Sequence, residues 1–93
     1  MTDLEITRLC AEAMGYHYMN DTGTPAMILT QEGLYRPLHD DAQAMALVKK
    51  FNLHIGKWDS GWACEYRGQV STNADLNRAI CECVAKLQAT RGA

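Results

Sequence analysis

The sequence predicts an α+β fold, in which a small antiparallel sheet from two hairpins packs with three helices. Three segments carry apolar residues three and four positions apart, which is typical of helices with one buried face. Between them lie two pairs of short segments suited to pleated sheets, each pair joined by turn-forming residues. No repeat or linker divides the chain, so residues 1–93 are expected to form a single domain. If the helices cover both faces of the sheet, the architecture is an α/β/α sandwich.

The first helix is predicted over residues 3–14. Thr2 and Glu5 have the spacing of a capping box, and Gly15 directly after the last apolar position favours the left-handed backbone that ends helices. The apolar stripe between these ends contains Ile6, Leu9, Cys10, Ala13 and Met14.

The first hairpin is predicted to pair residues 16–19 with residues 26–30. The segment between them, residues 20–25, is rich in Asn, Asp, Gly and Pro and therefore favours a turn. Residues 34–38 include Pro37, which cannot donate a ladder hydrogen bond, so they are expected to form an edge strand or an extended loop.

The second helix is predicted over residues 41–51, with Asp40 as its N-cap and Gln43 at its third position. Its inward stripe is Ala44, Leu47, Val48 and Phe51. A second hairpin follows, in which residues 53–55 alternate in polarity, residues 56–61 turn and residues 62–67 return. One face of the returning strand is expected to lie under the helices, and it carries Trp62, Cys64 and Tyr66.

The last helix is predicted over residues 72–88, with Thr72 and Asp75 as its capping signal. It is the longest run with a single period, so the fold is expected to be organised around it. Cys83 falls on its buried stripe and Cys81 on the flank. Because residues two apart on a helix point about 200° apart, these two thiols do not favour one metal ion, and no cofactor or metal is expected.

Composition limits the partners and the compartment. The chain is 47% hydrophobic and 22% charged, with nine basic and eleven acidic residues, a net charge of −2 and no long block of one sign. This favours an ordinary folded domain and argues against direct nucleic-acid binding. No segment is long and apolar enough to cross a membrane, and the acidic N-terminus differs from a signal peptide. We therefore expect a cytoplasmic protein with four reduced cysteines and no membrane partner.

Enzymatic motifs are not evident in the sequence. The best nucleophile and base are Cys64 and His54 on neighbouring strands, and His39 beside Asp40 and Asp41 is the best acid–base group. Packing and helix capping explain these residues more simply. No glycine-rich phosphate loop occurs, so the sequence predicts no enzyme.

A binding surface of aromatic and basic residues is the stronger candidate. Trp58 lies in a predicted turn, where a large apolar ring is expected to be exposed. The other residues predicted to contribute to binding are Tyr35, Arg36, Lys57 and Arg67.

Four stretches carry a resemblance to a known family. They are YRPLHDDAQAMALV at residues 35–48, WAC at 62–64, LNRAIC at 76–81 and AEAMGY at 11–16. Together they resemble the phage ABA sandwich domain family. The resemblance implies a small accessory protein of tailed phages or prophages with helices on both faces of a sheet. It implies no catalytic residue and no cofactor.

The function expected from these observations is a small phage-derived, non-enzymatic binding protein that inhibits or modulates a host protein. An anti-CRISPR or other anti-defence inhibitor is one such role, and the compartment is then the cytoplasm of the bacterial host. The alternative is a small-ligand protein that sequesters a nucleotide signal between aromatic rings and arginines, with a homo-oligomer as its expected state. A structural role in phage assembly is a third hypothesis.

Overall fold

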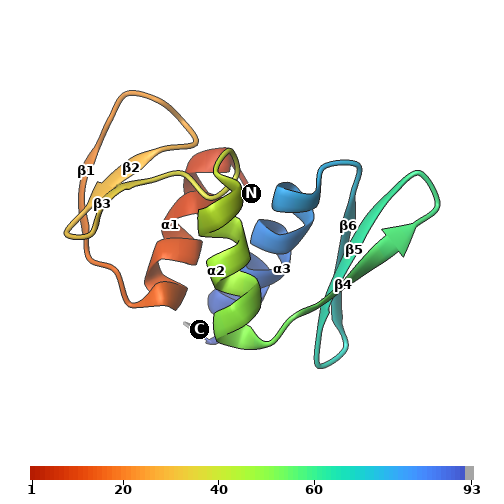
Figure 1. Ribbon diagram of the computed structural model, residues 1–93. Helices are drawn as coiled ribbons and strands as arrows, with labels where there is room; N and C mark the ends of the chain where they lie inside the picture. The colour runs from red at the N-terminus through yellow and green to blue at the C-terminus, as the bar shows by residue number, and fades with distance from the viewer. Residues whose placement is uncertain (92–93) are drawn as a thin grey trace.

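The three helices form a middle layer between two separate three-stranded sheets (Figure 1). The computed structural model describes residues 1–91. The helices are α1 (Asp3–Met14), α2 (Asp41–Phe51) and α3 (Leu76–Arg91); sheet A contains β1 (Tyr18–Asp21), β2 (Ile28–Thr30) and β3 (Gly33–Tyr35), and sheet B contains β4 (His54–Trp58), β5 (Gly61–Tyr66) and β6 (Gln69–Asn73). The α+β class is therefore confirmed.

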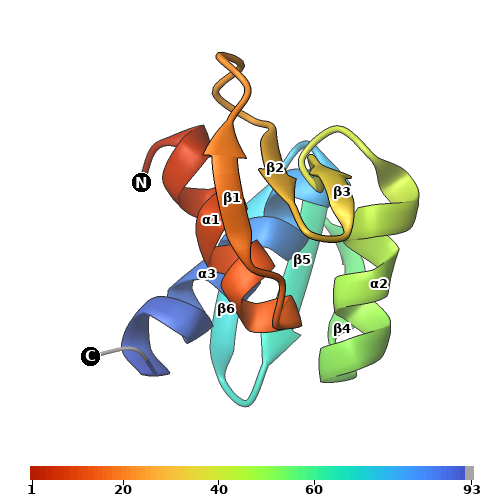
Figure 2. The ribbon, with the colours of Figure 1, turned by 90° about the vertical axis from the view of Figure 1, so that its left-hand side faces the viewer.

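The order of the layers differs from an α/β/α sandwich, the arrangement that the sequence allows if helices cover both faces of one sheet. Sheet A lies on one side of the helices and sheet B on the other, as the two views show (Figures 1 and 2). Each sheet is an antiparallel meander of three consecutive strands, in the order β1-β2-β3 or β4-β5-β6. Each hairpin continues through a tight turn into a third strand, so each sheet is completed locally and packs one face on the helices. The two hairpins therefore belong to separate sheets and do not join in one central sheet.

The local signals for α1 and α2 are confirmed. Thr2 Oγ1 accepts from the Glu5 N–H at 3.1 Å and Glu5 Oε1 accepts from the Thr2 N–H at 3.1 Å, which completes the capping box. Gly15 ends α1 with a φ of 79°. Asp40 Oδ1 accepts from the Gln43 N–H at 3.0 Å, and α2 has its predicted bounds. These caps depend only on neighbouring residues, which is why the sequence reveals them.

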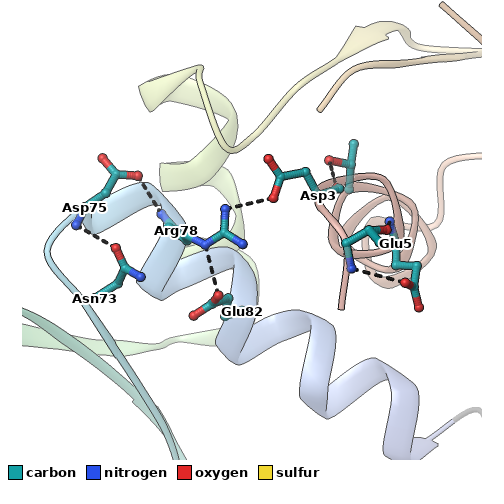
Figure 3. Close-up of polar contacts among 8 residues, drawn as sticks. Asp3, Glu5, Asn73, Asp75, Arg78 and Glu82 are labelled. Carbon is teal, nitrogen blue, oxygen red and sulfur yellow. Dashed lines mark hydrogen bonds and ion pairs between the residues drawn. The ribbon is translucent and has the colours of Figure 1, made fainter. Parts of the chain in front are cut away.

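The predicted start of the last helix is wrong. Thr72 lies in β6 and caps no helix, because the turn at Arg67 and Gly68, both with positive φ, returns the chain as a third strand. Val70 and Thr72, which are β-branched, suit that strand. Helix α3 begins at Leu76, and Asp75 Oδ2 accepts from the Arg78 N–H at 3.0 Å (Figure 3).

Helix α3 is the centre of the core, as expected. It contacts α1, α2, β5 and β6, so several sides of it are covered. Its buried residues are Ala79, Ile80, Cys81, Cys83, Val84 and Ala85. Cys81, predicted on a flank, is fully buried because α1 packs there, and its carbonyl accepts a hydrogen bond from the Cys10 thiol at 3.4 Å.

Arg78 joins the start of α3 to the start of α1. Its guanidinium contacts Asp3 Oδ1 at 2.8 Å and Glu82 Oε2 at 3.0 Å (Figure 3). The side chains of Arg78, Asp3 and Glu82 are 32%, 39% and 25% exposed, so each ion pair contributes less than about 1 kcal/mol. The Asp3 pair links α3 to α1, and the Glu82 pair lies within α3. Among residues 1–91, no helix combines the length and apolar character that a membrane crossing requires.

Candidate functional site

The five predicted binding residues occupy three separate places. Lys57 and Trp58 end β4, and Arg67 lies in the β5–β6 turn at the opposite end of sheet B. Tyr35 and Arg36 belong to the sheet A side, across the helical layer (Figure 1). The structure therefore does not assemble them into one surface.

Tyr35 is a core residue, and its predicted place on a binding surface is wrong. It is 3% exposed and its ring meets that of Tyr16 edge to face, with 5.3 Å between the centroids. Strand alternation in β3 directs Leu34 outward and Tyr35 inward. The Tyr35 hydroxyl has no hydrogen-bond partner among residues 1–91, and burial raises the pKa of Tyr35.

Trp58 is exposed at the tip of the β4–β5 hairpin, as the sequence predicts. It is 60% exposed, and its cross-strand partner is Gly61, which has no side chain to cover the ring. Asp59, with a φ of 49°, turns the chain directly after it. A shallow groove of about 250 Å³ runs beside the ring, lined by Trp58, Trp62, residues 59–61 and residues 72–74.

Gly61 holds this hairpin tip in place. A Cβ atom at Gly61 would lie 2.7 Å from the carbonyl oxygen of Asn73, so only glycine allows the tip to approach the β6–α3 connection this closely. The predicted turn at residues 56–61 gave no sign of this contact, because Asn73 is distant in sequence. The close packing makes the tip a supported platform for Trp58.

Lys57 precedes Trp58 in β4, so its positive charge lies on the face of the strand opposite to the Trp58 ring. Its register partner is Trp62, and its Nζ lies 4.4 Å from the centroid of the Trp62 ring. Trp62 is half-buried and packs against the core. A cation over an aromatic face is stabilised by the ring quadrupole, so the Lys57 side chain packs on the Trp62 ring of its own sheet.

Arg67 lies at a second, separate cleft. Its guanidinium is 5.3 Å from the centroid of the Tyr66 ring. With Gln69 and Arg91, these side chains line a shallow cleft of about 720 Å³ between the β5–β6 turn and the end of α3. Two guanidinium groups and an aromatic ring are chemistry suited to an anionic ligand.

Arg36 is exposed beyond β3 and reaches neither cleft. A further cavity of about 360 Å³ lies between sheet A and α2. Glu32 and Asp40 are among its lining residues, and Arg36 is not. A lining with two carboxylates and no basic side chain among residues 1–91 does not suit an anionic nucleotide.

Cys64 and His54, the best nucleophile and base in the sequence, do not form a catalytic pair. His54 pairs with Glu65 and Cys64 pairs with Ile55, so His54 and Cys64 lie on opposite faces of sheet B. Cys64 is fully buried, and its hydrogen bond with the Cys83 thiol, together with burial, raises its pKa. Such a thiol is a poor nucleophile. Of the residues described, 1–91, no three His, Cys, Asp or Glu side chains are grouped so as to hold a metal ion.

The chain matches no protein-family model, no curated protein and no solved structure. The resemblance to the phage ABA sandwich domain family is therefore unconfirmed and stays a prediction.

Proposed function

We propose that this chain is a non-enzymatic protein-binding module that contacts its partner with the hairpin tip around Trp58. The observation that carries the proposal is a tryptophan ring 60% exposed on a tip that Gly61 packs against the rest of the fold. A backbone held in place at the tip loses little conformational freedom when a partner covers the ring.

The energy available from this one ring is large. A tryptophan buries about 150–250 Å² when fully covered, so its exposed 60% corresponds to roughly 90–150 Å². At about 25 cal/mol per Å², covering it contributes about 2–4 kcal/mol. Asp59, Ser60 and Asn73 line the groove next to the ring and provide polar groups for a rim. An aromatic anchor inside a polar rim is the usual form of a binding hot spot.

The partner we propose is a host protein that the chain inhibits or modulates, in line with the phage resemblance. An anti-CRISPR or other anti-defence role is the specific form of this proposal. It requires no cofactor, because contact alone blocks or alters the target.

Capture from a bacterial lysate by the immobilised chain tests the proposal, with Trp58→Ala as the probe and Val70→Ala as its control. Val70 is 49% exposed on the outer face of the same sheet, but on β6, away from the tip. We expect Trp58→Ala to weaken binding of the captured protein by roughly 30- to 700-fold, and Val70→Ala to weaken it by less than about fivefold.

Circular dichroism and urea unfolding must show both variants folded. Equal capture by wild type and Trp58→Ala would contradict the proposal. Loss of several kcal/mol of stability in Trp58→Ala would instead show that the ring is a packing residue.

The second candidate function is the binding of an anionic small ligand, and the Arg67 cleft favours it. Mass spectrometry of molecules released on heating the purified protein tests this alternative. A released nucleotide that is absent from an Arg67→Ala preparation supports ligand binding. A defined protein partner without any released ligand supports the binding module.

A further inference from the structure

Strand β4 is a regular edge strand of sheet B, and its outer side pairs with no strand of residues 1–91. All five of its residues are exposed, and its pairing with β5 runs from His54 to Trp58 without interruption. An exposed edge strand presents unpaired N–H and C=O groups that can pair with another strand.

Two other edges of the molecule are protected. A register irregularity between Tyr18 and Asn20 interrupts β1. At the edge of β3, the Gln43 side chain accepts from the Arg36 N–H at 2.7 Å and donates to the Leu34 carbonyl at 3.0 Å, as a neighbouring strand would. Bulges and edge coverage are the usual devices that prevent strand pairing. Strand β4 has neither device, and β6 is the remaining outer strand.

The free backbone groups of β4 can be assigned from the turn. Trp58 and Gly61 close a two-residue turn, and such a closing pair is hydrogen-bonded. Hydrogen bonding alternates along an antiparallel pair, so Gly56 bonds to β5. The N–H and C=O groups of Ile55 and Lys57 therefore point to the free edge.

We propose that β4 pairs antiparallel with β4 of a second copy of this chain, about a two-fold axis at Gly56, to form a six-stranded sheet. In this register Ile55 of each copy forms a hydrogen-bonded pair with Lys57 of the other. Gly56 meets Gly56, where neither residue has a side chain to hold the strands apart. His54 of each copy lies opposite Trp58 of the other.

The charges of β4 are compatible with this pairing. Its fixed charge is on Lys57, which faces the apolar Ile55 of the other copy and not a second lysine. The Lys57 ammonium already lies over the Trp62 ring of its own chain. It therefore does not prevent strand pairing at this edge, as exposed lysines on edge strands usually do. With a net charge of −2 on each copy, long-range repulsion is small.

The expected dimer is weak and reversible. Contact with His54 of the other copy can cover at most the exposed area of Trp58, roughly 90–150 Å² per copy, and one strand of five residues adds a limited area. The interface therefore falls below the standard size of about 800 Å² per partner. The two Trp58 rings would lie on one continuous outer face, four residue positions apart along paired strands, or about 13 Å. This inference does not depend on the proposed function.

Cross-linking at the axis tests the register. In a non-hydrogen-bonded antiparallel pair the Cα atoms are about 4.5 Å apart, within the range of a disulfide. A Cβ at Gly56 meets no atom of residues 1–91 within 4 Å, so Gly56→Cys fits the monomer. Glutathione disulfide is the oxidant: the two thiols of a dimer release two protons and two electrons as their S–S bond forms, and the oxidant is reduced to two glutathiones.

We expect Gly56→Cys to form a covalent dimer on a non-reducing gel at least about tenfold faster than the matched edge variant Val70→Cys on β6. The native cysteines are fully buried and serve as the internal background. In sedimentation, the mass of the wild-type chain should rise above 10.4 kDa at high concentration. Lys57→Pro removes a free-edge N–H but no β4–β5 hydrogen bond, and should keep the chain monomeric.

Equal cross-linking at the two edges, or a wild-type chain that stays monomeric at about 1 mM, would overturn the inference, since a weak dimer must populate there. These measurements use the purified chain alone, so their failure leaves the lysate capture result unaffected.

Discussion

Gly61 offers the most direct test of how the hairpin tip is held. In Gly61→Ala, the added Cβ would lie 2.7 Å from the Asn73 oxygen, 3.0 Å from the Asn73 carbonyl carbon and 3.2 Å from the Ala74 Cα. All three are backbone atoms, which cannot rotate away as a flexible side chain does. The hairpin tip or the β6–α3 connection must therefore move.

The expected cost of this overpacking is about 1–3 kcal/mol of the free energy of unfolding. For a domain of this size each kcal/mol lowers the melting temperature by roughly 4–8 °C. The stability of a typical domain is about 5–15 kcal/mol, so the variant should still fold, with a clear loss.

Urea unfolding followed by tryptophan fluorescence measures the effect, with Gly56→Ala as the matched control. Gly56 is also a strand glycine of sheet B, but its added Cβ meets no described atom within 4 Å. We expect the control to change stability by less than about 0.5 kcal/mol. Equal stability of the two variants would refute the close contact between the tip and the β6–α3 connection.

Two further predictions concern the core and the N-terminal cap. Tyr35→Phe should raise the free energy of unfolding by about 0.5–2 kcal/mol in urea melts, because it removes a buried hydroxyl without a partner. A decrease of the free energy of unfolding by more than about 1 kcal/mol would instead show that the hydroxyl is hydrogen-bonded. The Thr2 backbone N–H, and then the Thr2 side chain, lower the pKa of Glu5 from its ordinary value of 4.5. A lowered folded-state pKa contributes stability that is present above 4.5 and is lost as the pH falls through the folded value. The melting temperatures of wild type and Glu5→Gln should therefore converge on acidification, and a constant difference would contradict this role.

The exposed ring of Trp58 was predictable, but its setting was not. A large apolar residue near a turn indicates a surface position from sequence alone. The contact of Gly61 with Asn73 joins residues that are not neighbours in the chain, so no local pattern reveals it. Tyr35 shows the opposite case, since an aromatic beside a basic residue suggested a surface and tertiary packing buried it.

The sequence by itself determined the α+β class, the bounds of α1 and α2, and the central role of α3. These features follow from caps and periodicity, which act over a few residues. Only the tertiary structure decided that helices separate two sheets, that residues 69–73 form a strand and not a helix start, and that Trp58 and Arg67 lie at opposite ends of sheet B. Those outcomes depend on which apolar faces meet, and an apolar stripe records only that a face is buried, not which partner covers it.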